Sequence, residues 1–155
     1  MIVEKRGNFL EATKEEKEDR VLILTCGIDG VGRSPYYWEF TKRYPISKDD
    51  KDNIKKVADE YKLDGKDPRH FAMELSHTNH PFKSTFLLVM NKDTRFSVSE
   101  PVFEFTLDDL IAKSKLSGYE KFIMPRLGLG DGLSWDFVKK TIERKEMDVV
   151  VYYNK

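Results

Sequence analysis

Two glycine-rich segments carry the residues best suited to binding a phosphate group. Residues 124–135 read Met-Pro-Arg-Leu-Gly-Leu-Gly-Asp-Gly-Leu-Ser-Trp and join a short apolar run to a helical pattern that begins at Ser134. Residues 27–35 read Gly-Ile-Asp-Gly-Val-Gly-Arg-Ser-Pro and follow the most apolar run of the chain. Glycines let backbone amides approach a ligand closely, and a helix N-terminus favours anions. Together the segments predict a shared phosphate site, although residues 27–35 taken alone could simply form a turn.

The elements that would position these segments are visible as apolar runs alternating with amphipathic stretches. The main runs are nearly continuous in apolar residues, as expected for strands that are covered on both faces. We expect strands at residues 21–26, 85–90, 121–124 and 148–152, and shorter strands at residues 2–5, 71–75 and 101–105.

Each helix between these runs is predicted by a start signal. The signals are an N-cap serine before a proline, capping boxes, and a single N-cap serine. They lie at Ser34–Pro35, at Ser47 with Asp50, at Thr106 with Asp109, and at Ser134. The charged residues 14–20 should form a solvated connection or a short helix. Strands interleaved with helices predict a three-layer α/β/α sandwich with a mixed, largely parallel sheet. In such a sheet, ligands bind beyond the carboxyl ends of the strands.

The length and composition of the chain argue against several classes of protein. The 155 residues fit one domain spanning residues 1–155. The 27 basic and 27 acidic side chains balance, which argues against a general nucleic-acid binder. No apolar run is long enough to span a bilayer, and the N-terminal residues lack the apolar core of a signal peptide. The lone Cys26 excludes an internal disulfide. We therefore expect an intracellular, cytoplasmic monomer without a membrane partner.

Several of these segments resemble the macro domain family, which binds ADP-ribose. Residues 124–135 resemble the family's second phosphate loop, and residues 7–10 (Gly-Asn-Phe-Leu) resemble the motif that ends its first strand. Residues 21–45 are similar to its second strand, first phosphate loop and following helix, and residues 148–153 to its closing strand. The resemblance covers nearly the whole chain and is weakest over residues 46–82. It implies a macro domain-like sandwich that needs no cofactor and no metal.

The resemblance also implies which residues hold ADP-ribose. Asn8 stands where the family usually has an aspartate that accepts the adenine amino group, and an asparagine can accept only through its neutral carbonyl. The first loop lacks the usual Met-Gly-x-Gly-Ile-Ala pattern and leads into Tyr36 and Tyr37, and the second loop is one residue shorter than in close relatives. The residues expected to bind the ligand are Asn8, Phe9, Gly27, Asp29, Gly30, Gly32, Arg33, Ser34, Gly128, Leu129, Gly130, Gly132 and Leu133.

The nearest likeness is to the branch of the family that removes ADP-ribose from macromolecules or hydrolyses ADP-ribose 1''-phosphate. By that resemblance Lys92 and Asp131 are the catalytic residues: a desolvated amine attacks the anomeric carbon of the distal ribose, and a carboxylate moves the proton. Lys92 is also compatible with an ordinary turn, since it lies in an Asn-Lys-Asp sequence. Two function classes stay open: a hydrolase, and a non-catalytic reader of ADP-ribose or a related nucleotide signal. The resemblance implies that the partner is ADP-ribose, or a protein or nucleic acid that carries it.

Other residues with chemical potential have weaker support. His70, His77 and His80 include a His-x-x-His pair, and a zinc site would need a further Cys, His or carboxylate in range. The histidines are spread over a loop-like segment with no cysteine partner. Cys26 is either a small buried residue or a nucleophile. The aromatic residues 36–38 pack in the core or in a loop, or one of them stacks on adenine or ribose.

Overall fold

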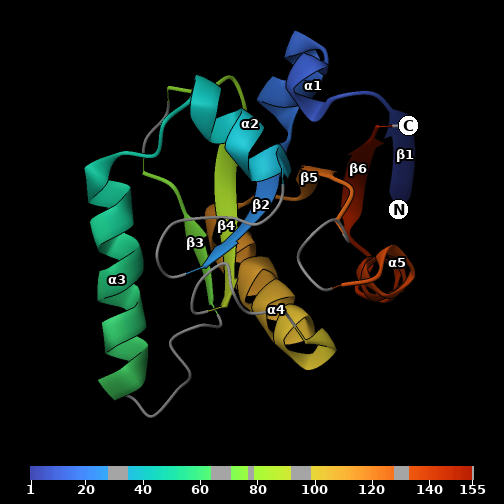
Figure 1. Ribbon diagram of the computed structural model, residues 1–155. Coiled ribbons are helices and arrows are strands. Elements are labelled where there is room, and N and C mark those ends of the chain that lie inside the picture. The colour runs from blue at the N-terminus through green and yellow to red at the C-terminus, as the bar shows by residue number, and fades with distance from the viewer. Residues whose placement is uncertain (28–34, 64–70, 77–78, 92–98, 128–132, 155) are drawn as a thin grey trace.

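The chain forms one sheet of six strands in the order β1-β6-β5-β2-β4-β3 (Figure 1). The computed structural model describes residues 1–27, 35–63, 71–76, 79–91, 99–127 and 133–154. In this order, each neighbouring pair from β1 through β6, β5 and β2 to β4 is parallel. The last strand, β3, is antiparallel to β4. The strands are β1 (Ile2–Arg6), β2 (Val21–Gly27), β3 (Phe71–Glu74), β4 (Ser84–Asn91), β5 (Lys121–Pro125) and β6 (Asp148–Tyr153). The predicted mixed, largely parallel sheet is confirmed.

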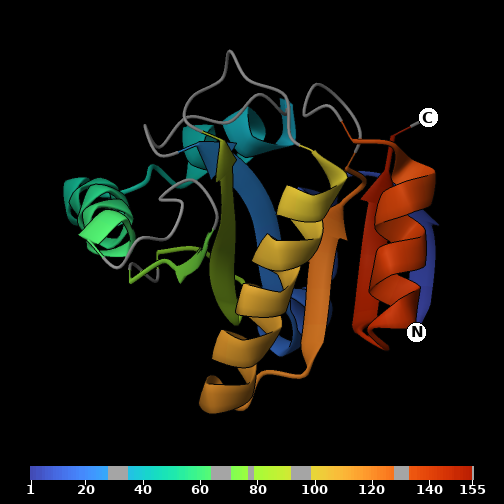
Figure 2. The same ribbon diagram turned by 90° about the horizontal axis from the view of Figure 1, so that it is seen from below.

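Helices cover both faces of the sheet, which gives the three layers (Figures 1 and 2). The short 3-10 helix η1 and the helices α2 and α3 pack on one face, whereas α4 and α5 pack on the other. The helical elements are η1 (Phe9–Glu11), α1 (Lys14–Asp19), α2 (Pro35–Arg43), α3 (Lys48–Leu63), α4 (Glu100–Ser117) and α5 (Trp135–Arg144). The charged residues 14–20 thus contain the short helix that was one of the two expectations for them.

The alternation of side chains along β2 shows why this strand lies at the centre. Val21 and Ile23 join the core beneath α4 and α5, whereas Leu22 and Leu24 join the core beneath α2 and α3. A strand buried on both faces must be apolar at every position, and this explains the continuous apolar run in the sequence.

The strand expected at residues 101–105 is wrong, because these residues form the start of α4. Ser99 has an extended backbone and takes the N-cap position, and Pro101 lies in the first turn, where a missing N–H costs nothing. Phe103 and Leu107 then fall on one buried face at helical spacing. Thr106 does not begin the helix: its hydroxyl donates to the carbonyl of Val102 at 2.7 Å inside it.

Two side chains of α4 form hydrogen bonds with the backbone of β3, the strand at one edge of the sheet. The carboxylate of Asp109 accepts a hydrogen bond from the N–H of Ala72 at 2.8 Å. The ammonium group of Lys113 donates to the carbonyl of Ala72 at 2.6 Å and forms an ion pair with Asp109 at 2.9 Å. Asp109 therefore acts between two elements and does not form the capping box expected with Thr106.

Candidate functional site

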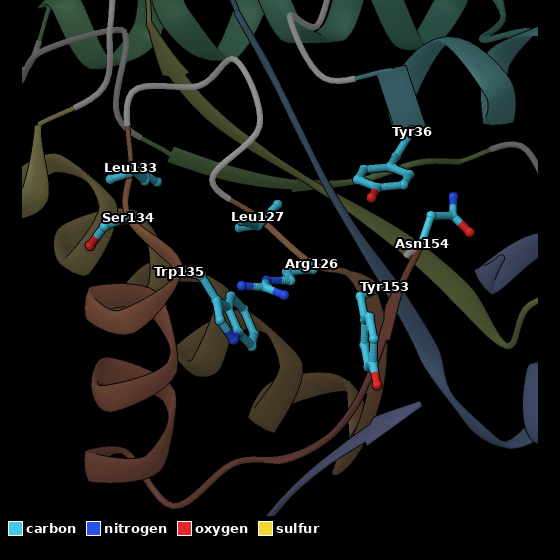
Figure 3. A pocket seen from close by; sticks show the side chains of 8 residues that line it. All are labelled: Tyr36, Arg126, Leu127, Leu133, Ser134, Trp135, Tyr153 and Asn154. Carbon is cyan, nitrogen blue, oxygen red and sulfur yellow. The ribbon is translucent and has the colours of Figure 1, made fainter. Parts of the chain in front are cut away.

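A cavity of about 380 Å³ opens beyond the carboxyl ends of β5 and β6 (Figure 3). This is the position where open α/β sheets bind ligands, and the volume falls in the range of small-molecule sites. The first turn of α2, the chain after β5, the start of α5 and the end of β6 all contribute to its wall. The lining residues are Tyr36, Arg126, Leu127, Leu133, Ser134, Trp135, Tyr153 and Asn154.

One wall of the cavity is formed by Arg126, whose guanidinium group lies over the indole ring of Trp135. The guanidinium carbon of Arg126 lies 5.6 Å from the ring centroid of Trp135. The indole N–H of Trp135 donates to Glu4 at 3.1 Å, and Lys139 pairs with the same carboxylate at 3.0 Å. Within the described chain no carboxylate forms an ion pair with Arg126. The wall therefore presents an exposed positive charge in a fixed place.

Two helices begin at this cavity and add further attraction for an anion. Ser134 lines the cavity and caps α5, accepting a hydrogen bond from the N–H of Phe137 at 3.2 Å. Tyr36 lies in the first turn of α2. Helix N-termini carry partial positive charge and free N–H groups, so the site favours a phosphate.

The opposite wall is formed by Tyr36, whose hydroxyl makes a hydrogen bond with the backbone of Asn154. Burial raises the pKa of Tyr36 above its usual value, and the nearby carboxylate of Glu39 raises it further. The phenol thus stays neutral at physiological pH. Of the three adjacent aromatic residues, Tyr36 lines the cavity, Tyr37 is buried, and Trp38 is 55% exposed.

Asn8 lies in the turn that follows β1, where the sequence predicted the adenine end of the ligand. Gly7, at φ +134°, turns the chain out of the strand in a conformation that L side chains rarely adopt. The side-chain carbonyl of Asn8 accepts from the N–H of Leu10 at 2.9 Å and caps η1. Its amide nitrogen donates to the carboxylate of Glu39 at 2.7 Å. The carbonyl expected to accept from adenine is thus already engaged within the protein.

Three more of the predicted ligand residues are described. Phe9 is buried, and its ring meets Tyr36 edge-on at 6.2 Å, so its side chain belongs to the core. Gly27 is the last residue of β2. Leu133 is 5% exposed and lines the cavity. The others lie outside the described residues: Asp29, Gly30, Gly32, Arg33, Ser34, Lys92, Gly128, Leu129, Gly130, Asp131 and Gly132.

The alternative chemistries receive little support from the described residues. His80 packs against Phe40, and its Nε2 lies 3.2 Å from the hydroxyl of Thr85. His70 and His77 lie outside the described residues. Among the residues that are described, no three His, Cys, Asp or Glu side chains are grouped as metal ligands. Cys26 is buried in the core.

Sequence reasoning missed a large part of the cavity wall. Arg126 and Trp135 belong to the motif that pointed to the site, but neither was assigned a contact. Tyr153 was assigned only to the closing strand, and Asn154 was given no role. They could have been found from topology, because residues at the carboxyl end of a parallel strand face the ligand edge of the sheet.

The arrangement of strands and helices is that of macrodomains. Over 99% of this chain and 97% of the other, the structure is similar to the macrodomain of Thermus aquaticus DarG, with a TM-score of 0.68 and 23% identity. Over 98% and 97%, it is similar to the macrodomain of Mycobacterium tuberculosis DarG, with a TM-score of 0.65 and 20% identity. Thermosipho africanus DarTG, solved in complex with ADP-ribose, matches 86% of this chain over 38% of its own, with a TM-score of 0.58 and 17% identity.

The fold is therefore a macrodomain fold, as the sequence motifs predicted. No protein-family model matches the chain, and no curated protein matches it significantly. No helix in the described segments is long and apolar enough to cross a membrane.

Proposed function

We propose that this protein binds ADP-ribose, with the adenosine half in the cavity and the diphosphate between residues 27–34 and 128–134. The observation that carries the proposal is the cavity itself, where two helix N-termini and the exposed cation of Arg126 meet aromatic walls. Aromatic rings suit a base and a ribose, and the positive groups suit a diphosphate. The ADP-ribose bound in the similar fold of Thermosipho africanus DarTG supports the choice of ligand.

We further propose that the protein hydrolyses an ADP-ribosyl linkage or the 1''-phosphate ester with Lys92 and Asp131. β4 ends at Asn91, immediately before Lys92, and β5 ends at Pro125, ahead of Asp131. Both strands flank β2 in parallel. Because neighbouring strands lie about 4.8 Å apart, the two strand ends emerge roughly 10 Å from each other at one edge. Side chains of the two following segments can converge across that distance.

In the proposed reaction Asp131 removes a proton from the Lys92 ammonium, and the free amine attacks the anomeric carbon of the distal ribose. The bond from that carbon to the leaving oxygen breaks, and the leaving group departs with the electron pair. Asp131 passes its proton to the leaving group, and the ribosylamine ring opens to an imine on Lys92. Water hydrolyses this imine, which releases ADP-ribose and restores the protonated lysine. Such acid–base help is worth about 10²- to 10⁴-fold in rate.

A binding assay followed by a product assay tests both parts. Calorimetry with millimolar ADP-ribose should give a measurable heat, and Gly130→Val should weaken binding more than tenfold by blocking the diphosphate. Lys92→Ala and Asp131→Ala should largely keep ADP-ribose affinity but abolish release of ADP-ribose from modified protein, modified nucleic acid or the phosphate ester. Borohydride should trap a covalent lysine–sugar adduct in the wild type and not in Lys92→Ala.

The same assays distinguish the alternative, a reader that binds ADP-ribose without turnover. The replacement of small residues by Tyr36 and Tyr37 after the first loop favours this alternative, since bulky side chains reshape the site. Binding without release from any of the three substrates would establish the reader. Absence of any heat or chemical-shift change with ADP-ribose would contradict the proposed function altogether.

A further inference from the structure

The helix α4 carries apolar side chains on its outer side as well as on the side that packs against the sheet. Phe103, Leu107 and Leu110 are buried in the core. On the outer side, Phe105 is 54% exposed and Leu116 is 90% exposed. A helix that is apolar on all sides is normally covered on all sides. The outer side of α4 therefore has the character of an interface.

The exposed apolar residues of α4 form one stripe. Residues that lie seven or eleven positions apart return to roughly the same side of an α-helix. Phe105, Ala112 and Leu116 have this spacing, and all three are exposed. The stripe is about 16 Å long, because each residue advances the helix by 1.5 Å. Figure 2 shows α4 on the outside of the molecule, with no other helix in front of it.

The charges along one flank of this stripe change sign from the first half of the helix to the second. Glu104, Asp108 and Lys115 share the flank, since they too are spaced by whole turns. Glu104 pairs with Arg144 and Lys145, and Asp108 pairs with Lys145 at 2.6 Å but keeps a side chain that is 59% exposed. Within the described residues no carboxylate forms an ion pair with Lys115. Lys115 is therefore a cation that a carboxylate of another chain can reach.

A second copy of α4 that runs antiparallel to the first matches both the stripe and the charges. Its acidic half then lies over the basic half of the first copy. The register that sets Phe105 of each copy against Leu116 of the other also sets Lys115 opposite residue 106, between Glu104 and Asp108. Twofold symmetry makes each of these contacts twice. The outer side of α4 is thus complementary to itself.

A hollow beside Leu116 gives the aromatic ring of the second copy a place to pack. The cavity has a volume of about 310 Å³ and lies between the second half of α4 and β3. Leu116 and Lys113 line it from α4, and Met73 and Phe86 line it from the sheet. A ring that packs on Leu116 meets the mouth of this hollow. Aromatic side chains contribute strongly to the energetics of interfaces, so this contact should supply much of the affinity.

We infer that two copies of this protein pair antiparallel through the outer side of α4, with Phe105 of each against Leu116 of the other and Lys115 between Glu104 and Asp108. The inference goes beyond the proposed function and does not depend on it. It departs from the monomer expected from the composition, which carries no information on the side of a helix that stays exposed. Because α4 leads from the carboxyl end of β4 back to the start of β5, the pair directs its two ligand-binding edges in opposite directions.

Sedimentation equilibrium of the full chain, from micromolar to submillimolar concentrations, tests the pairing. The contact is smaller than a standard interface, so the wild type should pass from monomer to dimer within that range. Phe105→Ser and Leu116→Ser should each weaken dimerisation more than tenfold, because each change removes two apolar contacts. Leu116 is so exposed that its replacement leaves the core intact. Trp38→Ser is the matched control, since Trp38 is 55% exposed on α2, which packs on the other face of the sheet.

Two charge reversals test the register. Lys115→Glu sets two acids against each other, and Asp108→Lys sets two bases against each other, so each variant alone should self-associate about tenfold more weakly at low salt. In an equimolar mixture the changed side chains carry opposite charges, and the other half of the pair keeps its wild-type contact. The mixture should therefore form a heterodimer with most of the wild-type affinity, which also shows that both variants are folded.

Each outcome decides the inference. A wild type that stays monomeric at every concentration overturns it. A dimer that Phe105→Ser and Leu116→Ser leave unchanged, or that Trp38→Ser weakens equally, uses another surface and also overturns it. A mixture of the two charge variants that associates no better than either alone excludes the antiparallel register. Weakening by both apolar substitutions together with recovery in the mixture supports it. ADP-ribose binding is measured separately, so its failure leaves the dimer standing.

Discussion

At the level of single residues, Trp135 links the cavity to β1 at the edge of the sheet. Its ring supports Arg126 at 5.6 Å, and its N–H is anchored to Glu4 on β1. The anchor fixes the ring before any ligand arrives, so the guanidinium above it loses little freedom on binding. Preorganisation of this kind lowers the entropic cost of association.

Trp135→Ala should therefore weaken ADP-ribose binding. A cation–π contact contributes about 0.5–2 kcal/mol, which corresponds to roughly a two- to thirtyfold loss of affinity in calorimetry. Trp38→Ala is the control, because Trp38 is the other tryptophan of the chain, is exposed and does not line the cavity. It should change affinity by less than about twofold. Equal effects of the two substitutions would remove Trp135 from the binding site.

At the level of elements, a buried carboxylate ties α3 to the segment that follows β3. Asp50 is 1% exposed, and one of its oxygens accepts from both the N–H and the hydroxyl of Ser76, at 2.9 and 2.7 Å. The N–H of Asp50 itself donates to Ser47, at 3.1 Å, so the expected helix start is confirmed. The aspartate of that predicted capping box does more than begin the helix, because it also fixes where the helix lies.

Asp50→Ala should destabilise the protein strongly. It removes the buried acceptor of the Ser76 N–H and hydroxyl, and each hydrogen bond to a charged group is worth about 1.5–3 kcal/mol. We expect the free energy of unfolding in urea to fall by about 3 kcal/mol, and by less in Asp50→Asn, which keeps an acceptor. Asp49→Ala changes an exposed aspartate of the same turn and should cost under about 0.5 kcal/mol. A loss no larger for Asp50 than for Asp49 would contradict this role.

The elements differ in how far the sequence determines them. β2 was predictable because burial on both faces requires apolar residues throughout, and α5 because Ser134 caps it. Residues 101–105 were misassigned because valine and phenylalanine favour strands, whereas the deciding helical spacing extends beyond that window. The wall at Tyr153 was not predictable from a motif. It depends on the register of β5 and β6, in which Pro125 pairs with Tyr152 and so brings the following residues together.

At the level of the whole molecule, one polar cluster joins both ends of the chain. The hydroxyl of Tyr152 on β6 donates to Glu16 on α1, and Lys5 on β1 pairs with the same carboxylate at 2.7 Å. Burial raises the pKa of Tyr152 well above its usual value, and the hydrogen bond to Glu16 adds to this. Burial alone would raise the pKa of Glu16, but the hydrogen bonds from Lys5 and Tyr152 outweigh it, and the pKa is lowered.

The pKa shifts of Tyr152 and Glu16 determine the highest and the lowest pH at which the cluster stabilises the protein. A raised tyrosine pKa contributes stability that is complete below the unfolded value of about 10 and is lost as the pH rises through the folded value. A lowered glutamate pKa contributes stability that is present above about 4.3 and is lost as the pH falls through the folded value. The cluster therefore stabilises the protein across the neutral range and weakens at both extremes.

Tyr152→Phe should lower the free energy of unfolding at pH 7 by about 1–3 kcal/mol, since Glu16 loses a half-buried hydrogen-bond donor. It should also flatten the decline of stability above pH 10, because the group that remains protonated only in the folded state has been removed. Urea unfolding measured at intervals from pH 7 to 11 checks both effects. Tyr44→Phe, which keeps the ring that packs on Phe40, is the control and should retain the wild-type slope. An unchanged slope in Tyr152→Phe would contradict the assignment.

The occupied edge of β3 has a consequence for how copies of this protein meet one another. A bare edge strand is a template on which a second chain can add, and repeated addition leads to fibrils. Here an incoming strand would find the N–H and carbonyl of Ala72 already bonded, and would have to separate Asp109 from Lys113 before it could pair. Because both side chains come from α4, the barrier to polymerisation is lost if that helix detaches, even while the sheet stays intact. At the β3 edge, resistance to strand addition therefore depends on the docking of one helix.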